Sequence, residues 1–299
     1  MAVLVVGSVA LDTIQTPFGR VENALGGSAT YFSLAAGLLD DVRMVGVVGE
    51  DFPDEYRDLL SARGIDTGGL KVAAGKTFRW TGAYKGSMNE AETLAVELNV
   101  FGSFTPEIPA SFADTEFVFL ANGSPRLQKA VRRQLPAAKL VVCDTMNFWI
   151  ETAREELVQL LREVDGVVVN DQEARMLTGS EALPAAGRRI LELGPRFAVI
   201  KKGEHGVILV SGKETFALPA YPTPEVKDPT GAGDSFAGGM MGFLSSSGEA
   251  SFGALKRAMA YGTVVASLTV EGFGTSALEC ARREDVEERL GLFRGMLEF

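Results

Sequence analysis

The strongest chemical signal in the sequence is a run of small residues that leads directly into a helical pattern, Asp228-Pro-Thr-Gly-Ala-Gly-Asp-Ser-Phe236. Glycines at a helix start leave backbone N–H groups unobstructed, and the helix dipole favours an anion such as phosphate there. Asp234 falls in the first turn, where its carboxylate could take a proton from an attacking hydroxyl group. This arrangement suits phosphoryl transfer, with the developing charge held by Gly231, Ala232 and Gly233.

On this run alone, a glycine-rich helix start with an ordinary capping aspartate is the competing interpretation. Other nucleotide-binding patterns are absent from the sequence. The GxGxxG pattern fails because Phe236 stands at its third glycine position, and the GxxxxGK[ST] loop does not occur. The HRD triplet of protein kinases is also absent, because Gly206 and Val207 follow the single histidine, His205.

A second group of candidates lies near the N-terminus and could hold the hydroxyl groups of a polar ligand. Gly26, Gly27 and Ser28 open a helical pattern that also contains Tyr31. Asp12 follows the first apolar run, and ligands bind at the carboxyl edge of a parallel sheet. A tight turn with a helix N-cap, and an ordinary turn aspartate, are the alternatives.

Two further segments could face nucleotide phosphates. Lys201, Gly203 and Gly206 belong to a turn between two apolar runs, for which a plain hairpin is the simpler interpretation. Asn170 could cap the helix that it precedes, and Glu173 could complete a capping box with it. The functional alternative is that Glu173 organises water around Mg²⁺ on the phosphates.

The composition excludes several other chemistries. The chain has 299 residues, of which 46% are hydrophobic, and can bury a large core. One histidine and two cysteines, Cys143 and Cys280, build neither a zinc cluster nor a disulfide framework. A formal net charge of −10 argues against binding of nucleic acid through phosphate neutralisation. Without an apolar run of membrane-spanning length or a signal-peptide pattern, we expect no membrane partner and a cytoplasmic location.

Short apolar runs and helical patterns alternate along the chain. The apolar, β-branched runs predict buried strands at 3–6, 42–48, 117–120, 140–142, 167–169, 198–200 and 207–210. Helical patterns occupy 29–39, 55–63, 126–135, 153–163, 185–193, 235–244, 252–268 and 283–290. This alternation predicts an α/β fold, in which helices cover both faces of a mostly parallel sheet.

One region departs from the alternation. Residues 76–84 and 93–101 alternate in polarity like the strands of an antiparallel hairpin, and the polar residues 85–92 join them. An antiparallel ribbon inside an α/β chain is a candidate lid over an active site. An edge hairpin without a catalytic role is the alternative.

Together the motifs resemble those of the PfkB/ribokinase family of ATP-dependent carbohydrate and nucleoside kinases. Residues 228–236 match its C-terminal signature, Asn170-x-x-Glu173 its magnesium and phosphate motif, and Gly26-Gly27 its N-terminal substrate signature. The turn at 201–206 matches its nucleotide-binding TxGxxG pattern, with Lys in place of Thr. Residues 45–51 and 64–67 fit the family as well, and all these motifs keep the family's order.

The resemblance implies a single ribokinase-like αβα sandwich over residues 1–299, with a small antiparallel β lid formed by segments at about 13–25 and 74–101. It implies ATP and Mg²⁺ as cofactors and Asp234 as the catalytic base. The anion hole would be formed by Gly231, Ala232 and Gly233.

The same resemblance assigns the other candidates to the ligands. Substrate hydroxyl groups would be held by three residues of the N-terminal part: Asp12, Gly26 and Gly27. ATP would lie against five residues of the C-terminal half: Asn170, Glu173, Lys201, Gly203 and Gly206. A monovalent cation such as K⁺ would bind beside the anion hole, at Asp228 and the Thr230 carbonyl group.

Departures from the family pattern bear on the substrate. Free-sugar kinases carry Lys and then Asn in the GG signature, where this chain has Ser28 and Tyr31. Losing two hydrogen-bonding groups weakens the case for a bare sugar. An aromatic side chain there, together with Phe78 and Trp80 of the lid, could stack on a flat base. Plain packing of these aromatic side chains is the alternative.

The segment 144–149 adds Asn147 near the same sheet edge and, with the lid ribbon, looks like part of a bacterial nucleoside kinase. We therefore expect an ATP-dependent kinase that phosphorylates the 5′-hydroxyl group of a ribonucleoside, with adenosine as first choice. One alternative is a kinase of ribose, fructose, fructose 6-phosphate or 2-keto-3-deoxygluconate. Another is a catalytically silent ligand-binding protein on the same fold. The sequence is compatible with a monomer and with a homodimer formed through the lids.

Overall fold

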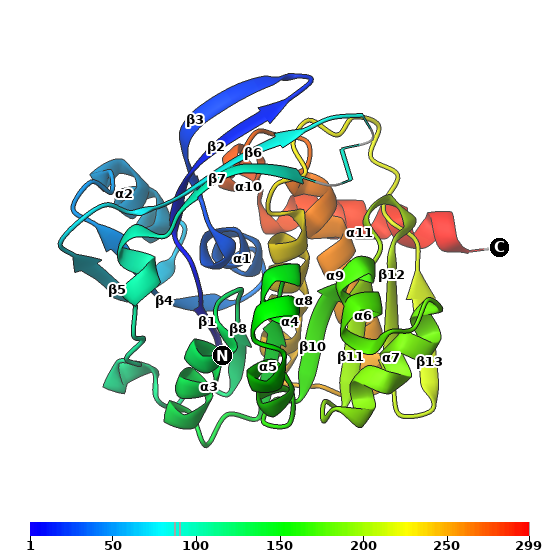
Figure 1. Ribbon diagram of the computed structural model, residues 1–299. Coiled ribbons are helices and arrows are strands. Elements are labelled where there is room, and N and C mark those ends of the chain that lie inside the picture. Colours follow the sequence, from blue (N-terminus) through cyan, green and yellow to red (C-terminus); the bar gives the residue numbers. More distant parts are fainter. Residues whose placement is uncertain (87, 90, 299) are drawn as a thin grey trace.

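The computed structural model describes residues 1–86, 88–89 and 91–298, so Ser87 and Glu90 of the expected connection 85–92 lie outside the described residues (Figure 1). Its main sheet has the strand order β13-β12-β11-β10-β9-β8-β1-β4-β5. The strands are β1 (Ala2–Val6), β4 (Asp41–Gly49), β5 (Ile65–Ala73), β8 (Phe117–Leu120), β9 (Leu140–Asp144), β10 (Gly166–Asn170), β11 (Phe197–Lys201), β12 (Val207–Ser211) and β13 (Glu214–Leu218).

Neighbouring strands of this sheet are parallel from β5 to β11, and β12 and β13 continue it as antiparallel strands. Strand β1 lies between β4 and β8, so the direction in which the chain adds strands reverses there. Ligands of open α/β sheets bind at the carboxyl ends of the strands beside such a switch point. The fold therefore places a ligand next to the residues that follow β1 and β8.

Helices cover both faces of the main sheet, as the strand and helix pattern predicted. One face carries α1 (Ser28–Ala36), α2 (Asp54–Ala62), α8 (Ala232–Ser247), α9 (Phe252–Thr269), α10 (Ser276–Cys280) and α11 (Arg283–Leu297). The other carries α3 (Pro125–Gln134), α4 (Asn147–Thr152), α5 (Arg154–Leu161), α6 (Asp171–Thr178) and α7 (Leu183–Glu192). In the described ranges no helix is both long enough and apolar enough to cross a membrane.

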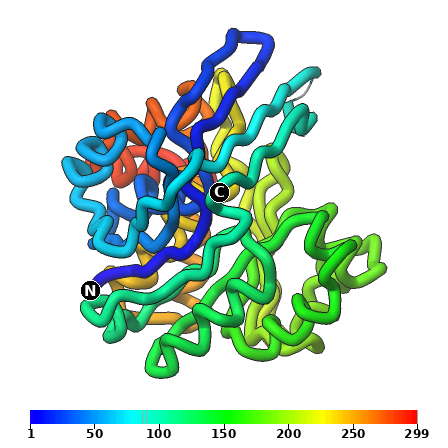
Figure 2. Tube along the Cα trace, turned by 60° about the vertical axis from the view of Figure 1, so that its left-hand side comes forward, coloured from blue at the N-terminus to red at the C-terminus, as the bar shows by residue number. Residues whose placement is uncertain are grey.

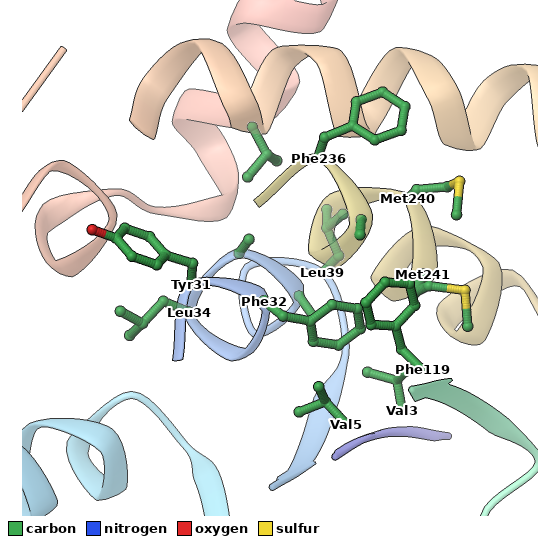
Figure 3. Packing of buried hydrophobic residues seen from close by; sticks show 14 of the residues in the cluster. Val3, Val5, Tyr31, Phe32, Leu34, Leu39, Phe119, Phe236, Met240 and Met241 are labelled. Carbon is green, nitrogen blue, oxygen red and sulfur yellow. The ribbon is translucent and has the colours of Figure 1, made fainter. Parts of the chain in front are cut away.

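The core consists of a large cluster on each face of the sheet. Because side chains alternate along a strand, Val3 and Val5 of β1 belong to one cluster and Leu4 to the other. Phe32 of α1 stacks on Phe119 of β8, with ring centroids 4.7 Å apart (Figure 3). This contact holds α1 over the switch point of the sheet.

A small sheet with the strand order β3-β2-β6-β7 projects from the carboxyl edge of the main sheet (Figures 1 and 2). Its strands are β2 (Ala10–Thr16), β3 (Gly19–Gly26), β6 (Phe78–Tyr84) and β7 (Ala91–Glu97). The pairs β2–β3 and β6–β7 are antiparallel hairpins, and the parallel pair β2–β6 joins them. The small sheet is thus mostly antiparallel and is assembled from two separate segments of the chain.

The structure corrects the expected strand at 93–101. Strand β7 ends at Glu97, and a short 3₁₀ helix, η1 (Asn99–Ser103), follows it. Asn99 takes a φ of 47°, and its side-chain amide donates to the Thr77 carbonyl group at 2.9 Å. The chain therefore turns at Asn99, which packs the ring of Phe101 against Phe78 with 5.5 Å between centroids.

Candidate active site

The N-terminus of α8 forms one side of the site. Gly231 caps the helix with a φ of 73°, and a Cβ atom there would come within 2.3 Å of the ring of Tyr31. Glycine is therefore favoured here for two reasons: the backbone is left-handed, and the ring of Tyr31 leaves no space for a side chain. Ala232 donates its N–H to the Pro229 carbonyl group at 3.1 Å, whereas no described backbone carbonyl outside the helix accepts from Gly233 or Asp234.

The carboxylate of Asp234 stands in the first turn of α8, as the sequence predicted. Desolvation raises the pKa of Asp234 to about 6, and the positive charge of Lys201 opposes this rise. A carboxyl group with this pKa is mostly ionised at neutral pH, yet binds a proton more readily than an ordinary aspartate. It therefore has the properties of a general base.

Asp12 lies on β2, so it belongs to the small sheet, and its side chain is 4% exposed. Burial raises the pKa of Asp12 to about 7, the charges of Asp228 and Asp234 add to the rise, and backbone N–H groups of Gly27 and Trp80 oppose it. Its Oδ1 atom has no hydrogen-bond partner among the described residues. A buried, unpartnered carboxylate oxygen is suited to a ligand hydroxyl group.

The turn at Gly26 and Gly27 is shaped around Asp12. A Cβ atom on Gly26 would lie 1.9 Å from Oδ2 of Asp12, so the aspartate side chain fills the space that another residue would need. These two glycines and Asp12 thus come together as the sequence predicted.

Ser28 and Tyr31 face the protein interior. The hydroxyl groups of Ser28 and Ser8 lie 3.1 Å apart, and each accepts from the other's backbone N–H. Tyr31 projects from α1 (Figure 3) and is 1% exposed. Its ring packs against Gly231. The structure therefore does not bring these two side chains to the surface of the site, and a role for Tyr31 in stacking on a base has no geometric support.

The aromatic residues of the small sheet share one face of β6, because Phe78, Trp80 and Tyr84 are separated by even numbers of residues. Trp80 donates its indole N–H to Oγ1 of Thr93 at 3.2 Å and packs in a cluster with Tyr84. Tyr84 was not among the sequence candidates, although its spacing from Phe78 and Trp80 could have indicated it. It reaches the turn before α8, where Thr230 donates to its hydroxyl group at 3.2 Å.

Asn170 and Glu173 form the capping box that their spacing allowed. Oδ1 of Asn170 accepts from the Glu173 N–H at 2.7 Å, and Oε2 of Glu173 accepts from the Asn170 N–H at 2.7 Å. Burial raises the pKa of Glu173, and the charge of Lys201 opposes the rise. The capping box leaves Nδ2 of Asn170 and Oε1 of Glu173 for other contacts.

The turn at 201–206 joins the antiparallel strands β11 and β12, so the hairpin interpretation is confirmed. Its centre is the 3₁₀ helix η3 (Gly203–His205), and Lys202 donates its N–H to the Gly206 carbonyl group at 2.7 Å. Asn89, between β6 and β7, donates to Glu204 at 3.0 Å. The small sheet therefore contacts this turn as well as the turn before α8.

Asp228 holds two turns together. Its Oδ1 accepts from the Thr230 N–H at 2.9 Å, and its Oδ2 accepts from the Gly274 N–H at 2.8 Å. The side chain is 1% exposed, and burial raises its pKa. Both carboxylate oxygens are thus engaged with the backbone.

Asp144 ends β9, and Asn147 follows it at the same sheet edge. Asn147 begins α4 and donates to Gln172 at 3.3 Å. Asp144 was not among the sequence candidates, although a carboxylate after a buried strand could have indicated it. Burial and the charge of Asp234 raise the pKa of Asp144, and the charge of Lys201 opposes the rise.

The described residues contain no group of three or more histidine, cysteine, aspartate or glutamate side chains placed to hold a metal ion. Mg²⁺ commonly keeps several waters and is held by one or two carboxylates plus the phosphates of a substrate. Glu173, with one carboxylate oxygen outside its capping box, fits an ion that arrives with a nucleotide rather than a protein-enclosed metal site.

Comparison with curated proteins gives relatives over most of the chain. A cytidine kinase from Thermococcus kodakarensis is 31% identical over 245 residues, which cover 80% of this chain and 86% of that protein. A nucleoside kinase from Methanothermobacter thermautotrophicus is 26% identical over 291 residues, which cover 91% of this chain and 90% of that protein.

Solved structures share the fold. The Burkholderia thailandensis nucleoside kinase in complex with inosine has a TM-score of 0.79 at 20% identity, covering 98% of this chain and 99% of that chain. A putative ribokinase II from E. coli in complex with ATP and Mg²⁺ has a TM-score of 0.81 at 19% identity, covering 97% and 99%. The model of the pfkB family carbohydrate kinases matches residues 2–281. The chain therefore belongs to the pfkB family and is an ATP-dependent kinase.

Proposed function

We propose that this kinase transfers the γ-phosphoryl group of ATP to the 5′-hydroxyl group of a ribonucleoside, with Asp234 as general base. The observation that carries the proposal is the contact of the small sheet, which holds Asp12, with the turn before α8, which leads to Asp234, through the bond from Thr230 to Tyr84. The charge of Asp234 contributes to the raised pKa of Asp12, so the two carboxylates share one electrostatic environment. A hydroxyl group held by Asp12 would be presented to Asp234 and to residues 231–233, which we call the anion-binding turn.

In this mechanism each residue has a distinct task. Asp12 orients the substrate by accepting from its hydroxyl groups, and Asp234 takes the proton of the attacking hydroxyl group. Of the anion-hole candidates Gly231, Ala232 and Gly233, Ala232 already donates its N–H to the Pro229 carbonyl group. The N–H groups of Gly231 and Gly233 would receive the charge that develops on the phosphoryl oxygens. Mg²⁺, when bound with ATP, neutralises phosphate charge, and Asn170 and Glu173 would hold its water shell. The turn at Gly203 and Gly206 would border the nucleotide.

A nucleoside fits the site better than a bare sugar. Two relatives that cover most of the chain are named cytidine kinase and nucleoside kinase. Trp80 and Phe78 give the small sheet an aromatic face, which suits stacking on a flat base. We keep adenosine as first choice because its two-ring base offers the larger stacking area, and cytidine is second because of the relative that bears its name.

A monovalent cation beside the anion hole is part of the proposal. Asp228 fixes the turn that contains Thr230, and the Thr230 carbonyl group would be a ligand. We expect activity to rise when K⁺ replaces a bulky organic cation at constant ionic strength. Equal activity in both salts would remove the cation from the proposal.

The test is ADP release by the purified protein with ATP, Mg²⁺ and one acceptor at a time. The panel contains adenosine, cytidine, inosine, ribose, fructose, fructose 6-phosphate and 2-keto-3-deoxygluconate. Nucleosides should react, and phosphorus NMR of the product should place the new ester at the 5′ position. Turnover of sugars alone would make the protein a sugar kinase. Tight binding of a panel member without turnover of any would identify a silent binding protein.

A further inference from the structure

Lys201, which the sequence placed in the candidate nucleotide-binding turn, reaches beyond that turn in the structure. It is the last residue of β11, and its side chain extends to the first turn of α8. A Cβ atom built on Gly233 would lie 2.6 Å from Nζ of Lys201. The ammonium group is therefore packed directly against the backbone of the anion-binding turn.

The charge of Lys201 acts on the acidic groups around it. Asp144, Glu173 and Asp234 are each raised in pKa by burial, and Lys201 lowers the pKa of all three. Asp144 ends β9, and Glu173 and Asp234 lie in the first turns of α6 and α8, so Lys201 lies where these three elements converge.

Among the residues that the structure describes, none accepts a hydrogen bond from the Lys201 ammonium group. Within residues 1–86, 88–89 and 91–298, its Nζ forms neither an ion pair within 4.0 Å nor a side-chain hydrogen bond, although Lys71, Lys85 and Lys139 all form ion pairs. A half-buried ammonium group with free donors beside an anion-binding turn is suited to a phosphoryl oxygen.

We propose that Lys201 is a catalytic residue that contacts the transferred phosphoryl group, a role that rests on the kinase reaction proposed above. The acceptor oxygen forms a bond to the γ-phosphorus as the bond from that phosphorus to the β–γ bridging oxygen breaks, which leaves ADP. The proton of the acceptor goes to Asp234. Lys201 keeps its own protons throughout and stabilises the charge on the phosphoryl oxygens.

A second role for the same charge is separable by experiment. If Lys201 served only to keep Asp234 ionised, its removal would shift the pH at which activity appears and leave the activity at high pH unchanged. A contact with the phosphoryl group predicts a lower plateau at every pH. The groups that titrate beside Asp234 are Asp12, Asp144 and Glu173. Removal of Lys201 also raises the pKa of Asp144 and Glu173, which moves the pH at which activity appears, whereas the plateau at high pH reports on the phosphoryl contact.

The experiment compares wild type with Lys201→Met over pH 5–9, with Lys201→Gln as a second variant if the first does not fold. Lys213→Met is the control, because Lys213 is exposed at the opposite edge of the sheet, between β12 and β13. We expect the kcat plateau to fall by roughly 10²–10³-fold, while KM for the nucleoside stays within a few-fold. A plateau equal to that of wild type at high pH would overturn the proposal.

Nucleotide binding gives a readout that does not need turnover. Calorimetry should show that Lys201→Met weakens a non-hydrolysable ATP analogue by about tenfold or more and leaves ADP affinity unchanged, because ADP lacks the γ-phosphoryl group. Equal affinities of both proteins for the analogue would contradict the contact. If wild type turns over no acceptor, the proposed reaction fails, whereas the binding comparison still decides whether Lys201 contacts the γ-phosphoryl group.

Discussion

The hydroxyl group of Thr230 donates to the hydroxyl group of Tyr84 across 146 positions of the sequence. Tyr84 ends strand β6 of the small sheet, and Thr230 precedes the helix start that carries Asp234. The bond therefore links the substrate side of the site to the anion-binding turn. We therefore expect that a movement of the small sheet would change the conformation of the turn before α8, and the reverse.

Tyr84→Phe removes this bond and keeps the ring in its cluster with Ile14 and Met88. The loss should be about 1 kcal/mol, which corresponds to roughly a fivefold decrease in kcat/KM for the acceptor. Thr230→Val should give a similar decrease, and the double variant should lose little more, because both changes remove one interaction. Tyr221→Phe, whose ring instead pairs with Phe293, is the control. Fully additive losses would show that the bond does not couple the two sides.

Asp234→Asn should lower kcat by about 10²–10⁴-fold and leave nucleoside affinity largely intact, because the amide keeps the shape but cannot take the proton. In wild type, kcat/KM should fall as the pH drops through about 6, where Asp234 becomes protonated. Steady-state kinetics and calorimetry measure the two effects. Substantial turnover by the Asn variant would assign the base elsewhere.

Asp12→Asn should change stability in a pH-dependent way. The pKa of Asp12 is raised from 3.8 to about 7, so the folded state binds this proton more tightly than the unfolded chain. Its contribution to stability is full below pH 3.8 and is lost as the pH rises through about 7. Asn does not titrate, so the variant does not lose stability in this way. The melting temperature of the variant minus that of wild type should therefore be larger at pH 8 than at pH 5.

Thermal denaturation at the two pH values measures this difference, with Asp58→Asn on the exposed side of α2 as control. Carboxylates that do not interact with Asp12 change stability in both proteins alike and cancel in the comparison. Asp228 and Asp234 are freed from repulsion by ionised Asp12 in the variant, which adds to the expected difference at pH 8. The same variant should bind nucleoside more weakly at both pH values. A constant difference in melting temperature between pH 5 and pH 8 would contradict the raised pKa of Asp12.

Trp80→Ala should weaken nucleoside binding by about 1–3 kcal/mol, the range for loss of an aromatic stacking partner of a base. Trp80→Phe should retain most of the affinity, and KM for ATP should not change. Phe148→Ala is the control, because that ring is 51% exposed on α4. Equal nucleoside affinity of Trp80→Ala and wild type would reduce Trp80 to a packing residue.

Much of the fold was predictable because strands covered on both faces are continuous apolar runs, as at Val3–Val6 and 167–169. The edge strands β5 and β13 lacked this signal, since exposed polar residues such as Asp66, Lys71 and Glu214 interrupt their apolar residues. The turn at Asn99 was missed because its direction depends on a bond to Thr77, which the alternation of 93–101 does not encode.

The candidate site was predictable where its parts are close in sequence. Gly231 to Asp234 combine a turn, a helix start and a carboxylate in one short segment, and Asn170 with Glu173 forms a local capping box. Contacts between distant elements were not predictable. The role of Tyr84 follows only from its hydrogen bond with Thr230. The inward packing of Tyr31 is possible only because Gly231, far away in the sequence, has no side chain.

The parallel pairing of β2 with β6 has a consequence for how such a protein could acquire a new substrate. The small sheet is formed by two hairpins, residues 10–26 and 78–97, which pair through β2 and β6. Neither hairpin alone therefore forms the complete sheet. In a chimera that takes one hairpin from a relative, β2 and β6 would come from different proteins, and their side chains would not be matched for pairing. Recombination should therefore transfer substrate specificity only when both segments are exchanged together. Single substitutions on one face of β6 can change the specificity on their own.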